Sequence, residues 1–254
     1  MINFSAKHDA LLRTVPFSGE LADETVAYDH DGVALEGFLT VDAAVSGPRP
    51  AVLVLHDWTG PQEYTRLRAH MIARLGYVAF AADLYGAGIR PTEMADCQAE
   101  AMKYYGDLPL LRARVRAAYD VLAADPRVDA SRIVVIGYCF GGSAALEFAR
   151  TGADLAGVVS FHGGLITQEP SDAAAITAPI LVLTGAADPV VPDADVVAFQ
   201  SELRDADVDF EIVSYAGAPH AFTLPETPAY REKADIRSWA RFRDFLDEVA
   251  LVRS

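Results

Sequence analysis

The fold is indicated most clearly by one stretch of the sequence, Ile133-Val134-Val135-Ile136-Gly137-Tyr138-Cys139-Phe140-Gly141-Gly142. Its first half is a β-branched apolar run typical of a buried strand, and the Ala- and Leu-rich segment 143–150 that follows is typical of a helix. Cys139 therefore lies at the turn from strand to helix. The glycines two residues to either side, Gly137 and Gly141, allow strand and helix to approach closely at a strained turn. We expect the sulfur to lie beside the helix N-terminus, whose partial positive charge favours a thiolate.

The two cysteines of the chain differ in their surroundings. Cys139 has the pattern of a reactive thiol, although a buried structural cysteine in a glycine-rich turn is the alternative. Cys97 lies in the segment 93–105 without any such pattern, and we expect it to be a packing residue or an inert thiol. Two cysteines are too few for a disulfide framework and too isolated for a zinc site, so no metal is expected.

Apolar runs alternate with helical patterns along the chain, which predicts the α/β class with a doubly wound, mostly parallel sheet. An antiparallel hairpin precedes this sheet, formed by Glu24–His30 and Val33–Val41 around an Asp31-Gly32 turn. The expected buried strands are Ala51–His56, Tyr77–Ala82, Ile133–Tyr138, Leu155–Phe161, Ile180–Thr184 and Phe210–Tyr215.

Segments of helical periodicity separate these strands. The stretch Tyr85–Pro109 falls outside the simple alternation and predicts an extra helix or a lid-like excursion. One domain over residues 1–254 accounts for the whole pattern. The expected helices are Tyr64–Leu75, Leu110–Ala123, Ser143–Arg150, Asp193–Asp205 and Asp235–Val252.

The charge of the chain limits its partners. It has 36 acidic and 21 basic residues, a net charge of −15, which disfavours nucleic acid and anionic membranes. No apolar run approaches the roughly 20 residues of a membrane-spanning helix. Charged residues such as Lys7 and Arg13 interrupt the N-terminal segment, so we expect no signal peptide and a cytoplasmic location. The expected partner is a small molecule, and the protein is expected to be a monomer or a small homo-oligomer.

An aspartate and a histidine, Asp188 and His220, follow Cys139 in the order that is expected of the acid and the base in an α/β fold with a nucleophile at a strand–helix turn. Asp188 follows the strand 180–184 and lies between small residues and prolines, where it can orient a histidine. His220 follows the next strand and is the only histidine after Asp188. In a hydrolase His220 would accept the thiol proton, and Asp188 would fix its tautomer. The alternatives are a turn-capping aspartate and a surface histidine.

Acyl transfer also requires hydrogen-bond donors to the developing oxyanion. The backbone N–H groups of Phe140 and Trp58 are the candidates, because one follows the nucleophile and the other lies in the loop after an early strand. Alternatively His56 and Asp57 cap the following helix. Ligands of α/β sheets bind at the carboxyl ends of strands, so the candidate pocket walls, each of which could instead be a packing residue, are Asp57, Trp58, Tyr85, His162 and Phe222.

These motifs resemble those of the dienelactone hydrolase family, whose members are cysteine-dependent enzymes with an α/β-hydrolase fold. The resemblance extends from the early hairpin to the C-terminal helix and implies a Cys139–His220–Asp188 triad, a thioester intermediate, and no metal or organic cofactor. The matching segments are Gly137-Tyr138-Cys139-Phe140-Gly141-Gly142, Asp83-Leu84-Tyr85, Gly185-x-x-Asp188-x-x-Val191-Pro192 and His220-x-Phe222.

The chain departs from the family pattern at three positions. A family glutamate that helps to generate the thiolate is replaced by Asp57, which is one methylene shorter. The two arginines that hold a substrate carboxylate in archetypal members are replaced by Ala87 and Leu224, and Arg90 lies near the first of them without matching it. Without these bidentate carboxylate partners, a neutral and more hydrophobic ester or lactone is favoured over an anionic dienelactone.

The sequence therefore predicts an esterase or lactonase with a cysteine nucleophile. A thiolate attacks activated carbonyls well but also leaves easily, so aryl esters, enol esters and lactones are expected and peptide amides are not. Three alternatives remain open, namely a hydrolase of activated phosphotriesters, a thiol or redox protein, and a ligand receptor without turnover.

Overall fold

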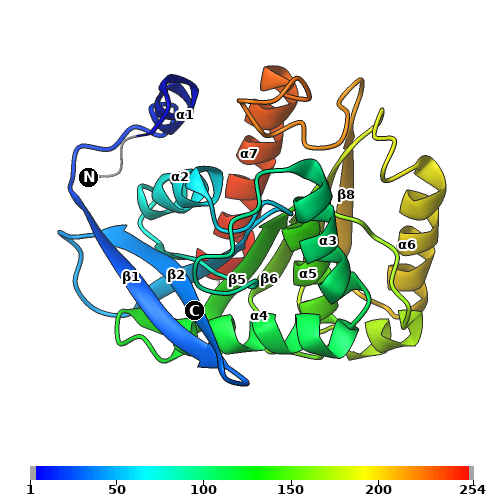
Figure 1. The fold of residues 1–254 in the computed structure, drawn as a ribbon, viewed down its shortest axis with the longest axis horizontal. Helices are drawn as coiled ribbons and strands as arrows, with labels where there is room; N and C mark the ends of the chain where they lie inside the picture. The colour runs from blue at the N-terminus through cyan, green and yellow to red at the C-terminus, as the bar shows by residue number, and fades with distance from the viewer. Residues whose placement is uncertain (1–3, 252–254) are drawn as a thin grey trace. The chain divides into compact units, whose positions relative to one another are not determined.

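The computed structural model describes residues 4–251, in which the chain forms two compact units, residues 1–133 and 134–254. Each unit is an α/β arrangement of strands and helices (Figure 1). The predicted organisation as one domain over 1–254 stays a prediction.

The strands of the first unit begin with the predicted antiparallel hairpin, β1 (Leu21–His30) and β2 (Val33–Asp42), drawn in blue in Figure 1. Asp31 and Gly32 at its turn both have a positive φ, 54° and 74°, as a type I′ turn requires. Two further strands, β3 (Arg49–Leu55) and β4 (Val78–Ala81), are buried along their whole length and pair in parallel. The order of these strands is β1-β2-β4-β3.

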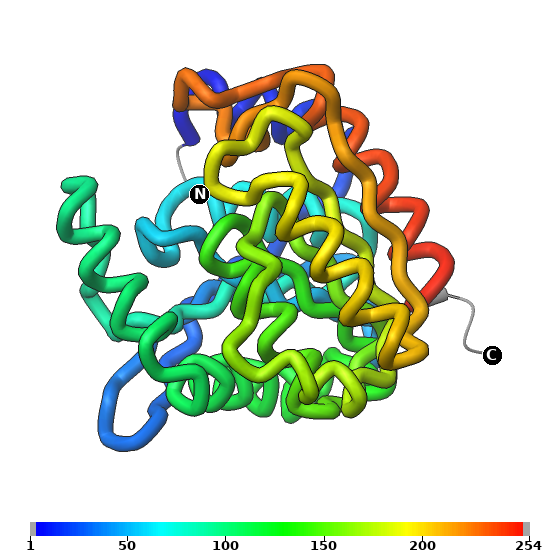
Figure 2. Tube along the Cα trace, turned by 90° about the vertical axis from the view of Figure 1, so that its right-hand side faces the viewer, coloured from blue at the N-terminus to red at the C-terminus, as the bar shows by residue number. Residues whose placement is uncertain are grey.

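The described residues of this unit, 4–133, form four helices. The helices α2 (Glu63–Ala73) and α4 (Leu108–Ala123) match the prediction within two residues at each end. The excursion contains α3 (Met94–Tyr105), which meets α4 at a tight corner (Figure 2). The fourth helix, α1 (Ala6–Leu12), was not predicted because seven residues without apolar periodicity give no helical signal.

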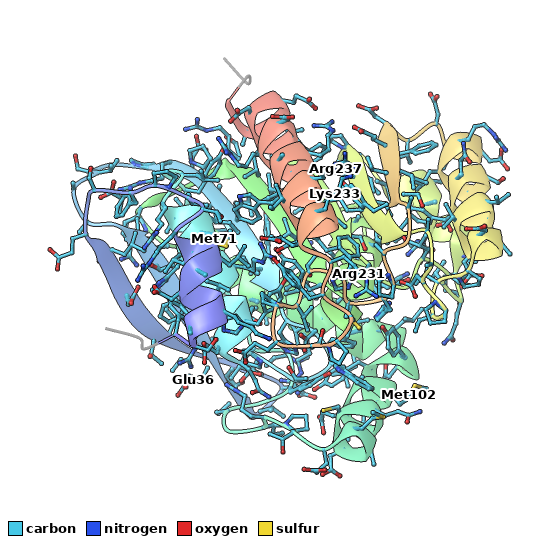
Figure 3. The ribbon with its side chains drawn as sticks, turned by 90° about the horizontal axis from the view of Figure 1, so that it is seen from above. Glu36, Met71, Met102, Arg231, Lys233 and Arg237 are labelled. Atoms are coloured by element: carbon cyan, nitrogen blue, oxygen red, sulfur yellow. The ribbon has the colours of Figure 1, made fainter. Side chains whose placement is uncertain are left out.

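Tertiary contacts explain why α1 forms. His8 Nδ1 lies 2.6 Å from Glu63 Oε1 on α2, and Arg74 donates a hydrogen bond of 2.8 Å to the carbonyl of Leu12. In Figure 3, α1 lies over α2, where Met71 is labelled. Short helices are marginal alone, and α1 is stabilised by this docking.

The second unit continues β5 (Val128–Tyr138), which begins in the first, with three parallel strands in the order β5-β6-β7-β8. The strands β6 (Gly157–Phe161) and β7 (Ile180–Gly185) are fully buried, as expected for the continuous apolar runs of a parallel sheet. The last strand, β8 (Phe210–Tyr215), has the predicted bounds.

The helices of the second unit follow its strands in sequence. They are α5 (Phe140–Ala149), α6 (Asp193–Asp205) and α7 (Glu232–Leu246), together with the 3-10 helix η1 (Pro170–Ala175) and the π-helical turn η2 (Asp247–Leu251). Figure 3 labels Lys233 and Arg237 along α7. The predicted helix 235–252 is thus an α-helix that begins three residues earlier and ends in a π-helical turn. Residue 252 lies outside the described residues.

The predicted fold class is confirmed by the parallel strand pairs and the N-terminal antiparallel hairpin. The carboxyl ends of β5, β6, β7 and β8 bear Cys139, His162, Asp188 and the loop with His220, respectively. Within residues 4–251 no helix is long and apolar enough to cross a membrane.

Candidate active site

The turn between β5 and α5 holds Cys139 in a strained conformation. Its φ of 54° and ψ of −114° lie outside the regions that ordinary side chains favour. Gly137 makes the turn possible, because a Cβ at this position would lie 2.0 Å from the carbonyl oxygen of Gly141. The predicted close approach of strand and helix is therefore present, and it presents the Cys139 side chain at the amino end of α5.

A second close contact joins the start of α5 to the loop after β6. A Cβ on Gly163 would lie 2.7 Å from the backbone of Gly142 and from the nitrogen of Ser143. The N–H of Cys139 donates a hydrogen bond of 2.9 Å to the carbonyl of Phe161. The turn that carries Cys139 is thus held on one side by the end of β6.

Three side chains from different strand ends form one hydrogen-bonded row. Cys139 Sγ lies 3.0 Å from His220 Nε2, and His220 Nδ1 lies 2.9 Å from Asp188 Oδ2. Because an ionised carboxylate can only accept, the His220 Nδ1–H donates to Asp188 and leaves Nε2 facing the sulfur. The arrangement can move a proton between the sulfur and the imidazole.

Asp188 is itself fixed by its own backbone turn. Its Oδ1 accepts hydrogen bonds from the N–H groups of Val190 and Val191, at 2.8 and 3.1 Å, and its side chain is fully buried. Asp188 therefore caps this turn, as the alternative interpretation predicts, and its role as an acid stays a prediction. One carboxylate oxygen holds the turn and the other contacts the imidazole, so the carboxylate has little freedom to rotate.

The surroundings of His220 favour its charged form. Burial lowers the pKa of His220, but hydrogen bonds to Asp188 and Cys139, together with the negative charge of both partners, outweigh burial and raise the pKa to about 10. The side chain of His220 is 18% exposed, so solvent reaches one side of the ring. An imidazolium next to the sulfur stabilises negative charge on it, as a nucleophilic thiolate requires.

Phe140, one candidate oxyanion donor, is the first residue of α5. The first bond of the helix ladder is donated by Ser143 to the carbonyl of Cys139, at 3.2 Å. The backbone N–H of Phe140 therefore lies in the first turn, where N–H groups precede the helix ladder and favour an anion.

The candidate residues Asp57, Trp58 and Tyr85 lie in the first unit. Asp57 is buried, and its Oδ1 accepts from the N–H and the hydroxyl of Thr59, at 2.8 and 2.5 Å. The Tyr85 hydroxyl donates a hydrogen bond of 3.2 Å to the carbonyl of Trp58. This bond orients the Trp58 backbone within its loop. The roles of these three residues in a pocket or an oxyanion hole stay predictions.

The alternative that His56 and Asp57 cap the following helix is wrong. Helix α2 has Gln62 at its N-cap and no side-chain cap. His56 instead joins two loops. Its Nδ1–H donates a hydrogen bond of 2.6 Å to the carbonyl of Asp57, and its Nε2 accepts one of 3.2 Å from the N–H of Leu84. Burial lowers the pKa of His56 to about 4, so the ring is neutral.

The candidate residues His162 and Phe222 lie next to His220. The ring of His162 meets that of His220 edge-on at 5.4 Å, and Phe222 packs at the same distance against His162. Both are fully buried, so their contact with a substrate stays a prediction. His162 Nε2 lies 2.8 Å from the hydroxyl of Thr223, which the sequence analysis did not single out.

Cys97 contrasts with Cys139. It is 2% exposed, its thiol donates to the carbonyl of Pro91 at 3.5 Å, and burial together with the charge of Asp57 raises its pKa. These surroundings favour the neutral thiol and support its interpretation as an inert packing residue. Among the described residues, no group of three or more His, Cys, Asp or Glu side chains could hold a metal ion.

Comparison with known families and sequences gives a consistent result. The model of the "Dienelactone hydrolase family" matches residues 35–250. A protein of Salmonella typhimurium described as "Putative carboxymethylenebutenolidase" is 29% identical over 80% of this chain and 78% of its own length. A Bradyrhizobium protein described as "Probable 2-oxo-3-(5-oxofuran-2-ylidene)propanoate lactonase" is 30% identical over 86% of this chain and 93% of its own length.

Among solved structures, a dienelactone hydrolase-like promiscuous phosphotriesterase from metagenomic libraries is similar over almost its whole length. Its TM-score is 0.87 and its identity 36%, over 91% of this chain and 99% of the other. The predicted α/β-hydrolase fold is thereby confirmed.

Proposed function

Because the chain belongs to the dienelactone hydrolase family, we propose that it hydrolyses small, neutral, activated esters or lactones with Cys139 as nucleophile. The observation that carries the proposal is the row of Cys139 Sγ, His220 and Asp188, with separations of 3.0 and 2.9 Å. A nucleophile, a base within hydrogen-bond reach and a third group that orients the base are the parts that covalent acyl transfer needs.

In the first half of the reaction the Cys139 thiolate attacks the carbonyl carbon, and the carbonyl electron pair moves to its oxygen. When the tetrahedral intermediate collapses, the bond to the leaving oxygen breaks and His220 Nε2–H protonates that oxygen. The products are an alcohol, or the opened end of a lactone, and a thioester on Cys139. The carboxylate of Asp188 stabilises the imidazolium before this proton is given up.

In the second half a water molecule attacks the thioester. Neutral His220 accepts a proton from the water as its oxygen bonds to the acyl carbon, and the carbon–sulfur bond then breaks. The acid is released, the thiolate of Cys139 returns, and His220 is again an imidazolium. The negative oxygen in both tetrahedral intermediates is expected to accept hydrogen bonds from the N–H groups of Phe140 and Trp58.

The proposed preference for neutral substrates rests on the basic side chains of the chain. Ala87 and Leu224 stand where the family's carboxylate-binding arginines are expected. Arg90 is engaged elsewhere, since it donates to the carbonyls of Gly86 and Ile89 at 3.1 and 2.7 Å and lies 3.6 Å from Asp83. Its cation is thus already paired inside the first unit, which supports a substrate without a carboxylate.

A second candidate function is hydrolysis of activated phosphotriesters by the same nucleophile. It is favoured by the 36% identity to a solved protein described as a promiscuous phosphotriesterase. Attack at phosphorus would form a phosphorylated Cys139 and expel an aryloxide. A burst of p-nitrophenol from paraoxon, equal in amount to the protein, would support it, and no release above the rate in buffer would reject it.

The proposed function is tested with p-nitrophenyl acetate and butyrate. The wild type is expected to turn over both esters, and Cys139→Ala is expected to abolish turnover. Cys97→Ala is the matched control, because it removes the other thiol and should leave turnover unchanged. Undiminished hydrolysis by Cys139→Ala would reject the proposal. The cytoplasmic location, the oligomeric state and the independence from cofactors stay predictions.

A further inference from the structure

Three strained residues cluster around the proposed triad. Among the described residues of the second unit, non-glycine residues with a positive φ are Cys139, His162, Asp207 and Ala221, at 54°, 42°, 56° and 59°. Asp207 lies in the turn after α6, whereas the other three end β5 and β6 or adjoin His220. Such a conformation costs about 1 kcal/mol or more, and it persists where the surroundings hold it in place. Neither His162 nor Ala221 takes part in the reaction above, and of the two only His162 has a polar side chain.

The backbone of His162 is fixed to the sheet. Its N–H donates a hydrogen bond of 2.8 Å to the carbonyl of Leu183 on β7. The next residue, Gly163, is pressed against the first turn of α5, where a Cβ would lie 2.7 Å from backbone atoms of Gly142 and Ser143. The His162 ring therefore starts from a point that is fixed relative to Cys139.

From that fixed point the ring reaches the loop that carries His220. His162 Nε2 lies 2.8 Å from the hydroxyl of Thr223, three residues after His220, and both side chains are fully buried. The His162 ring also contacts the rings of His220 and Phe222, each at 5.4 Å. One side chain thus joins the end of β6 to both ends of the segment from His220 to Thr223.

Glycine or asparagine would adopt this backbone conformation with less strain than histidine. A histidine at such a position needs compensation, which the hydrogen bond to Thr223 and the ring contacts supply. We propose that His162 is a positioning residue that, through Thr223, holds the His220 imidazole between Cys139 and Asp188. The inference rests on the proposed function for its effect on turnover, but its effect on His220 is a property of the resting protein.

Thr223 provides the first test. Thr223→Val removes the hydroxyl and keeps the shape, Thr223→Ser restores a hydroxyl, and Thr184→Val is the matched control. Thr184 is also buried in the second unit, and its hydroxyl has no hydrogen-bond partner among the described residues. We expect Thr223→Val to lower kcat for p-nitrophenyl acetate by about tenfold or more with little change in KM, because a misplaced imidazole impairs proton transfer rather than binding. Thr223→Ser should recover most of the loss, and Thr184→Val should behave as the wild type.

The pKa of His220, measured by NMR titration, reports the position of the ring in the resting protein without any need for turnover. The hydrogen bonds to Asp188 and Cys139 raise the pKa of His220, so a ring that leaves this position should titrate at lower pH. We expect a lowered pKa in Thr223→Val and the wild-type value in Thr223→Ser and Thr184→Val. If His220 of the wild type has the raised pKa but the protein hydrolyses no ester, the proposed function fails. The His220 pKa of the variants then still decides this inference.

Variants of His162 distinguish the effect of its ring from the effect of its backbone conformation. His162→Asn and His162→Gly both fit the left-handed backbone, and we expect each to lower kcat and the His220 pKa in the same way as Thr223→Val. The double variant His162→Asn/Thr223→Val should be no worse than the single variants, because both break one connection. These variants keep the inference testable if Thr223→Val does not fold. Wild-type kcat and His220 pKa in a folded His162→Asn or Thr223→Val protein, or a failure of Thr223→Ser to recover, would overturn it.

Discussion

His220 Nε2 lies 3.0 Å from Cys139 Sγ, although the two residues are 81 positions apart in the chain. The sheet brings them together, since β5 and β8 each present their carboxyl end on the same edge of the parallel strands of the second unit. In this position the imidazolium can stabilise the thiolate, and the imidazole can then give a proton to the leaving oxygen and accept one from water in the two halves of the proposed reaction.

Replacing Cys139 should change the titration of His220. In Cys139→Ala the hydrogen bond and the negative charge of the sulfur are both lost, while Asp188 remains, so the pKa of His220 should fall below its value of about 10. NMR titration of the imidazole in both proteins measures the difference. An equal His220 pKa in the two proteins would show that the sulfur does not act on the ring.

Asp188→Asn should nearly abolish turnover while the fold is kept. The amide oxygen can still accept from Val190 and Val191, but the amide no longer stabilises an imidazolium and can select the wrong tautomer. We expect kcat/KM to fall by about 10³- to 10⁴-fold with p-nitrophenyl butyrate. Asp193→Asn, an exposed change on α6, is the control. A loss of less than about tenfold would contradict the role given to Asp188.

The stability of the protein should depend on pH through His220. The pKa of its imidazole is raised from 6.5 to about 10 on folding, so folding favours the protonated ring. The contribution is fully present below pH 6.5 and is lost as the pH rises through about 10. The difference in free energy of unfolding between the wild type and His220→Gln should therefore shrink as the pH rises from 7 to above 10. Urea denaturation across this range, with a difference that stays constant or grows, would contradict the prediction.

Gly163→Ala should destabilise the fold at the turn that carries Cys139. The new methyl group would lie 2.5 Å from Ser160 Oγ and 2.7 Å from the backbone of α5, so the loop or the helix must move. We expect a loss of about 1–3 kcal/mol in free energy of unfolding. The neighbouring change Gly164→Ala meets only the Ser143 hydroxyl, at 3.1 Å, and should cost less. Denaturant titration that ranks the two variants in the opposite order would refute this explanation.

Leu224→Arg should alter the choice of substrate. Leu224 is half-buried four residues after His220, at the position where the family resemblance expects a carboxylate-binding arginine. We expect the variant to raise kcat/KM for an ester that carries a carboxylate, relative to its neutral analogue, by about tenfold or more, as one charge-assisted hydrogen bond can provide. An unchanged ratio of the two kcat/KM values would remove the basis for the proposed neutral preference.

The sequence predicted the elements whose pattern is strong over several residues. The Asp31-Gly32 turn, the buried apolar strands and the helix α6 were all recognised, because their turn chemistry or periodicity is local. The three residues of the proposed triad could be singled out for the same reason, since each follows a strand within a short motif. Their separations and the charge state of His220 depend on tertiary structure.

Other features could not be read from the sequence. The helix α1 depends on contacts such as His8 with Glu63, 55 residues away, rather than on its own propensity. His162 was only a candidate wall because a single histidine after a strand carries little information. Its positive φ and its partner Thr223, 61 residues further on, become visible only in the folded chain. Asp57 does not cap α2, because the helix begins six residues later, after Gln62, and the Asp57 carboxylate accepts from Thr59 instead.

The central claim is that Cys139 becomes acylated during turnover. Mass spectrometry of the protein quenched in acid during hydrolysis of p-nitrophenyl butyrate tests it most directly, because a thioester survives acid and can be assigned to a peptide. We predict one butyryl group on the peptide that contains Cys139 and none on the peptide that contains Cys97. Hydrolysis that proceeds with Cys139 unmodified, or with the acyl group on another residue, would contradict the account.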